Sequence, residues 1–134
     1  MDTFFHVSSS GDNPEAVLQD CMQQLVNCPE DANFGFIYVS DELADSLENI
    51  LHHCKVTSGI QNWTGSLGVG IIADNIEVYD KPAISLLLCR FDEKQFNMLL
   101  PIKKSDELAA NAKAPESSEA CFAFLHADGY LEQA

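Results

Sequence analysis

The fold is decided by the stretch Trp63-Thr64-Gly65-Ser66-Leu67-Gly68-Val69-Gly70-Ile71-Ile72, in which three glycines fall within six residues. Glycine has no Cβ, so it lets another backbone or a ligand come close, but it weakens the interior of a strand. The order G-x-x-G-x-G reverses the dinucleotide-binding fingerprint, and no phosphate-binding helix or P-loop lysine follows it. Two interpretations stay open: a glycine-rich strand in a crowded sheet, or bare main chain that borders a ligand.

The segments around this stretch predict one α/β domain with a mixed sheet, in which a βαβα start precedes antiparallel hairpins; an α+β fold is the alternative. Apolar and β-branched runs predict strands at 4–8, 34–39, 67–72, 76–79, 83–89 and 120–125. The run 83–89 is apolar on both faces, which favours a central strand.

Apolar residues spaced three and four apart predict helices at about 14–27 and 41–58, and a short helix at 93–100. Asn13 with Pro14 marks the start of the first helix. Ser40 or Asp41 is expected to cap the second. Small and polar residues at about 103–119 predict a flexible connector.

The chain is strongly acidic. Its 134 residues carry 21 Asp and Glu against only 7 Lys and Arg, a formal net charge of −14. Because binding to nucleic acid depends on Lys and Arg that displace counterions, this balance argues against a DNA or RNA partner. An anionic membrane surface is disfavoured for the same reason. No apolar run is long enough to span a membrane, and no secretory signal is recognisable.

Cysteine usage indicates a reducing compartment. The five cysteines are widely spaced and form no C-x-x-C pair, a pattern that predicts free thiols and a cytoplasmic protein. Cys21 and Cys28 are expected to share a helix face as small buried hydrophobes.

The sequence offers few catalytic or metal-binding signals. His52, His53 and Cys54 are adjacent, but neighbouring helix residues point about 100° apart and rarely share one metal. No G-x-S-x-G elbow is present, although His6, His126 or the pair His52 and His53 could meet a serine in space. Aspartates at element boundaries are expected to serve as caps and turn residues. Trp63 is either core or the stacking wall of a pocket.

Four segments together resemble the N-terminal FIST domain. They are Phe34-Gly35-Phe36-Ile37-Tyr38-Val39-Ser40-Asp41, then Thr57-Ser58-Gly59-Ile60, the motif W-x-G-S-x-G-V-G-I from Trp63 to Ile71, and Glu77-Val78-Tyr79-Asp80-Lys81-Pro82-Ala83. The resemblance implies a non-enzymatic sensory module of bacterial signal transduction that binds a small molecule such as an amino acid. The signature positions that it marks as expected ligand-binding residues are Trp63, Gly65, Ser66, Gly68, Gly70, Tyr79 and Asp80.

The resemblance also leaves two alternatives. One is a haem- or iron-dependent nitric-oxide sensor that controls a histidine kinase, with His52, His53 and His126 as weak candidate ligands. The other is a protein-interaction module that needs no ligand. His126-Ala127-Asp128-Gly129 resembles the start of the next FIST segment, so an incomplete domain is expected, and its uncapped sheet edges would favour self-association.

Overall fold

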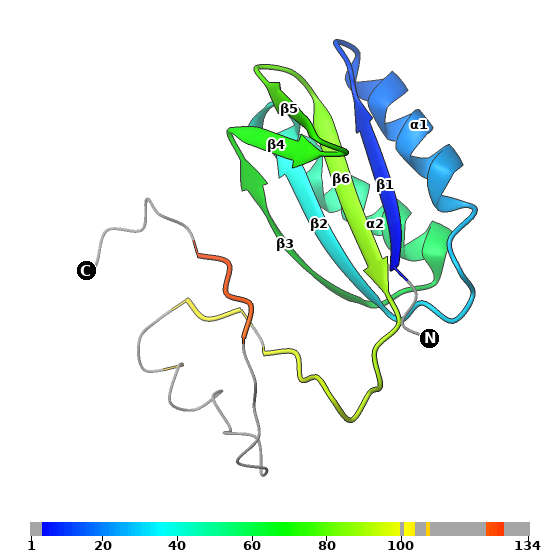
Figure 1. The fold of residues 1–134 in the computed structure, drawn as a ribbon. Helices are drawn as coiled ribbons and strands as arrows, with labels where there is room; N and C mark the ends of the chain where they lie inside the picture. Colours follow the sequence, from blue (N-terminus) through cyan, green and yellow to red (C-terminus); the bar gives the residue numbers. More distant parts are fainter. Residues whose placement is uncertain (1–3, 100, 104–106, 108–122, 128–134) are drawn as a thin grey trace. The chain divides into compact units, whose positions relative to one another are not determined.

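The computed structural model describes residues 4–99, 101–103, 107 and 123–127. The chain divides into two compact units, Met1–Phe91 and Asp92–Ala134, and each is considered by itself. The first unit holds a mixed sheet with two α-helices and a small hairpin (Figure 1).

The main sheet has four strands in the order β1-β6-β2-β3. They are β1 (Phe4–Ser10), β2 (Phe34–Ser40), β3 (Asn62–Gly68) and β6 (Ala83–Cys89). β6 pairs antiparallel with β1 on one side and with β2 on the other, whereas β2 and β3 run parallel. The prediction of an α/β fold with a mixed sheet is therefore confirmed, and the doubly apolar run does form a central strand.

Helix α1 (Pro14–Leu25) begins where the sequence predicts. The Asn13 side-chain oxygen accepts hydrogen bonds from the amides of Glu15 and Ala16, at 2.9 and 3.1 Å, which satisfies two of the amides that lack a partner within the helix. The helix ends at Leu25, so Cys28 lies beyond it and does not share its face with Cys21.

The second helix starts later than predicted. A 3₁₀ helix, η1 (Asp41–Ser46), precedes α2 (Leu47–Ser58). The N-terminus of η1 and that of α2 both lack a capping hydrogen bond from a side chain, so the predicted cap by Ser40 or Asp41 is wrong. The Ser40 hydroxyl instead accepts a hydrogen bond of 2.8 Å from the amide of Ala83, which joins the end of β2 to the start of β6. Gly59, with φ of 75°, ends α2 in the left-handed conformation that glycine tolerates.

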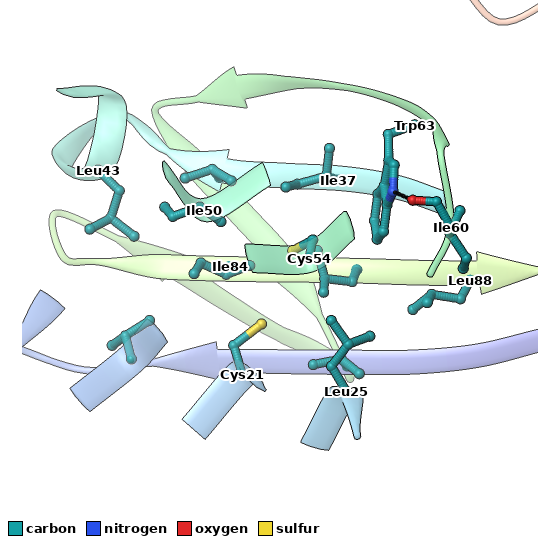
Figure 2. Close-up of a cluster of buried hydrophobic side chains, with 14 residues drawn as sticks. Cys21, Leu25, Ile37, Leu43, Ile50, Cys54, Ile60, Trp63, Ile84 and Leu88 are labelled. Carbon is teal, nitrogen blue, oxygen red and sulfur yellow. Dashed lines mark hydrogen bonds between the residues drawn. The ribbon is translucent and has the colours of Figure 1, made fainter. Parts of the chain in front are cut away.

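Both helices cover the same face of the sheet and bury one core against it (Figures 1 and 2). The core joins α1 and α2 to alternate residues of the strands: Val7, Val17, Cys21, Leu25, Ile37, Val39, Leu43, Ile50, Cys54, Ile60, Trp63, Ile84, Leu86 and Leu88.

Trp63 belongs to this core. Its side chain is 9% exposed, and its indole N–H donates a 2.8 Å hydrogen bond to the Ile60 carbonyl (Figure 2). The ring lies on Gly35, where a Cβ would approach to 2.4 Å. Of the two interpretations of this tryptophan, the structure supports core packing.

The strand predicted at 67–72 is wrong, because the chain leaves the main sheet at Val69. Beyond it, β4 (Gly70–Ala73) and β5 (Ile76–Tyr79) form a separate two-stranded antiparallel sheet. The turn between them is as predicted: Asp74 and Asn75 have φ of 50° and 62°, values that a two-residue hairpin turn requires and that Asp and Asn tolerate.

Two predictions for the C-terminal part are also wrong where the structure describes it. Residues 93–95 form a turn, in which the Asp92 side chain accepts from the Lys94 amide, and 96–99 have no regular structure. A helix this short is marginal without packing. Residues 123–125 are irregular rather than a strand. Leu100, 120–122 and the expected connector, except 103 and 107, lie outside the described residues. Among the described residues, no helix could cross a membrane.

The contact between β2 and β3 makes Gly65 intolerant of any side chain. A Cβ at this position would lie 1.7 Å from the Ile37 carbonyl oxygen. We expect Gly65→Ala to lower the free energy of unfolding by about 3 kcal/mol, as for severe overpacking. Urea denaturation measures this. Gly11→Ala is the matched control, because its Cβ would meet Val17 at an ordinary 3.6 Å; equal stability losses in both variants would contradict the packing argument.

Burial of two thiols makes stability depend on pH. Desolvation raises the pKa of Cys21 and of Cys54 from 9.0 to about 12. Because the folded state holds these protons more tightly, stability is retained below about pH 9 and falls as pH rises toward 12, by up to roughly 1.4 kcal/mol per thiol for each pH unit. Urea denaturation between pH 7 and 10 measures the slope. The Cys21→Ala, Cys54→Ala double variant should be less stable at pH 7, but its free energy of unfolding should change less between pH 7 and 10.

Candidate functional site

A row of hydroxyl groups crosses the face of the sheet opposite the helices. In the strand registers, Ser8 of β1 lies opposite Ser85 of β6, Ser85 lies opposite Tyr38 of β2, and Tyr38 lies opposite Ser66 of β3. Side chains alternate between faces along a strand. The helix-side core contains residues at the alternate positions of all four strands: Val7, Ile37, Val39, Trp63, Ile84 and Leu86. The four residues, which we call the hydroxyl row, therefore share the other face.

The Ser66 end of this row opens into a hollow of about 280 Å³, the glycine hollow. It lies where β3 passes into β4, and its walls are Tyr38, Ser66, Leu67, Gly68, Gly70, Ile71 and Ile72. Two hydroxyl-bearing residues and the main chain of two glycines thus border the same space as aliphatic side chains. Such a mixture suits a small molecule with both polar and apolar parts.

The structure divides the seven sequence-predicted site residues. Ser66, Gly68 and Gly70 come together in the glycine hollow. Trp63 and Gly65 do not: the indole lies in the core on the helix side, and Gly65 accommodates the backbone of β2.

Tyr79 and Asp80 do not line the hollow either. The Tyr79 ring covers Gly70, where a Cβ would come within 2.3 Å of the ring, so that glycine also has a packing role in the hairpin. Asp80 occupies a turn with φ of 55°. This placement agrees with the expectation that boundary aspartates are turn residues.

A second polar cluster surrounds His6. The His6 Nδ1 atom lies 3.0 Å from the Asp74 carboxylate, and His6 Nε2 lies 3.4 Å from the Ser85 hydroxyl oxygen. The Ser8 hydroxyl donates a 2.9 Å hydrogen bond to the other Asp74 oxygen. The sequence does not predict these contacts, because the residues come from β1, the β4–β5 turn and β6. It indicates only that His6 could meet a serine.

This cluster adjoins a smaller hollow of about 180 Å³, the hairpin hollow. Its walls come from the hairpin, from the end of β1, from the start of β6 and from α1. The lining residues are Ser8, Ser9, Ser10, Asp20, Ile71, Ala73, Asp74, Ile76, Val78, Ala83 and Ile84. Ser8 and Asp74 belong to both the hollow and the His6 cluster. The hollow combines an aliphatic wall with two carboxylates.

The weak metal-ligand candidates do not converge in the part of the chain that the structure describes. There, no three His, Cys, Asp or Glu side chains are grouped to hold a metal ion. His52 and His53 are exposed on α2 with ring centroids 5.9 Å apart. Burial keeps Cys54 on that helix a neutral thiol with pKa of about 12, whereas metals bind the thiolate. His126 is half-buried in the second unit.

Comparison with protein-family models, with curated proteins and with solved structures gave no match for this chain. The resemblance to the FIST domain therefore stays a prediction that rests on the motifs quoted above.

Asp74 fastens the hairpin to β1, and its removal should loosen the hairpin alone. Asp74→Ala deletes the contacts with His6 and Ser8 and places a residue that disfavours positive φ at 50°. A loss of about 1.4 kcal/mol would raise amide hydrogen exchange in β5 about tenfold. Exchange in β6 should not change. Asp74→Asn, which tolerates the turn, should show a smaller increase; equal exchange in all three proteins would contradict the fastening role.

Proposed function

We propose that this chain is a cytoplasmic sensory domain that binds a small molecule in the glycine hollow, and that binding rather than turnover is its signalling function. The observation that carries the proposal is the convergence of Ser66, Gly68 and Gly70 on one hollow that Tyr38 also borders. These three residues belong to the segment that resembles the FIST motif.

The main chain of β3 supports a polar ligand. Among the strands that the structure describes, β3 lies at the edge of the main sheet and pairs with β2. Main-chain groups on the outer side of an edge strand point away from the ladder, where a ligand can meet them. The absence of a Cβ at Gly68 brings this main chain closer to the hollow, whereas at Gly70 of β4 the Tyr79 ring takes the space of the missing Cβ.

Size and charge narrow the class of ligand. A hollow of about 280 Å³ falls just below the usual range of about 300–1,000 Å³ for small-molecule sites, which favours a molecule of amino-acid size. The net charge of −14 repels anions and attracts cations. We therefore favour an amino acid or another small amine over a phosphorylated ligand.

The hairpin favours a second candidate function, contact with a signalling protein such as a histidine kinase. Ile72 and Tyr79 share one face of the β4–β5 hairpin and are 69% and 53% exposed, and Val69, next to β4 in the chain, is 66% exposed. Exposed apolar side chains that are close together often mark protein contacts. Binding of a partner to the hairpin without any small molecule would favour this candidate over ligand sensing.

The test of ligand binding is to fill the glycine hollow. We expect one or more of the twenty amino acids to raise the melting temperature of the wild-type chain, and calorimetry to give a 1:1 complex. Ser66→Val and Gly68→Val should weaken binding at least tenfold, because each side chain projects from the wall of the hollow.

Gly11→Ala is the control, since Gly11 is outside the hollow and a Cβ there would meet Val17 at an ordinary 3.6 Å. Circular dichroism should show that all variants are folded. If Ser66→Val and Gly68→Val bind every ligand as the wild type does, the hollow is not the site. If Gly68→Val unfolds, Ser66→Val decides the result.

A further inference from the structure

His6 lies between a carboxylate and a hydroxyl in the order used for acyl transfer. With the Asp74 carboxylate 3.0 Å from Nδ1, the ring proton is held on that nitrogen. Nε2 then presents its lone pair to the Ser85 hydroxyl, 3.4 Å away. Such sites are recognised by geometry and roles, whatever the order of the residues in the chain.

Two further features position the carboxylate. Ser8 donates a 2.9 Å hydrogen bond to the Asp74 oxygen that does not face His6, so both carboxylate oxygens are engaged. Asp74 itself adopts φ of 50° at the hairpin turn. His6 and Ser8 lie two apart on β1 and therefore share one face of the sheet. The arrangement is built from three separate elements.

From this geometry we infer that Ser85 is a nucleophile that accepts a small acyl group from a carboxylic ester. His6 Nε2 takes the Ser85 proton as the oxygen attacks the ester carbonyl. The tetrahedral adduct then expels the alcohol, which receives that proton, and leaves an acyl-serine. Water attacks in the second half with His6 again as base, which releases the carboxylic acid and restores the serine.

The surroundings of Ser85 limit both rate and substrate. Ser85 is 8% exposed and lies within the ladders with β1 and β2, so its own amide belongs to the sheet. In serine hydrolases that amide commonly stabilises the oxyanion, and one such donor is worth about 10²–10³ in rate. Slow acylation by activated esters of short acids is therefore the expected activity. Acetyl esters suit this confined position.

The experiment follows acetylation of the full chain by p-nitrophenyl acetate. We expect one equivalent of p-nitrophenol to be released quickly relative to turnover, and fragment-ion mass spectrometry to place the acetyl group on Ser85. Ser66 is the internal control, because it occupies the same hydroxyl row two strands away. Ser85→Ala should abolish the release phase, whereas Ser66→Ala should retain it.

Two substitutions of His6 test the base. His6→Ala and His6→Gln should each lower the acetylation rate at least 100-fold, and the second preserves most of the side-chain volume.

Asp74→Asn tests the positioning residue: the maximal rate of acetylation should fall at least tenfold while the half-saturating ester concentration stays unchanged. If Asp74 only maintained the structure, its substitution would change the maximal rate and the half-saturating ester concentration together.

The inference is overturned if folded wild-type chain carries acetyl groups on lysines or Ser66 but not on Ser85, or if both His6 variants react at the wild-type rate. The inference is independent of the proposed sensory function, since His6, Asp74 and Ser85 do not line the glycine hollow. Ser66→Val tests ligand binding and leaves acetylation at Ser85 intact, so failure of one proposal is distinguishable from failure of the other.

Discussion

The close approach of β2 and β3 is the constraint on which the rest of this structure depends. Gly65 lets the backbone of β3 lie against the Ile37 carbonyl, and Gly35 gives the Trp63 ring its place in the core. With the indole held on the helix side, strand alternation places Thr64, Ser66 and Gly68 on the opposite face. The position of the glycine hollow and the end of the hydroxyl row are both consequences of this packing.

Local patterns predicted most of the first unit and little of the site. Asn13, Gly59 and the Asp74-Asn75 turn carry their own conformational signals, and the doubly apolar β6 indicated its central place. The break at Val69 was missed because an apolar run does not show where a strand leaves one sheet for another. The Ser85–His6–Asp74 contacts could not be predicted for a related reason. They depend on which strands become neighbours in the sheet, and the spacing of residues along the chain does not determine the strand order.

The two candidate sites use different properties of the same sheet face. At the β3 edge, missing side chains expose main chain, and a ligand there would meet amide and carbonyl groups. Near β1, side chains from distant segments are held against one another, and the chemistry comes from a fixed histidine. Gly70 illustrates how packing and function combine, because it borders the hollow and also accommodates the Tyr79 ring.

The sheet order also has a consequence for synthesis of the chain. β1 pairs with β6 in a register that joins Phe4 to Cys89, so β1 finds this neighbour only after the intervening strands and helices have been synthesised. β6 in turn separates β1 from β2. Contacts between residues so far apart in sequence slow folding, and an unpaired strand is prone to aggregate. Until β6 has been synthesised, β1 therefore keeps an unpaired edge to which a chaperone can bind.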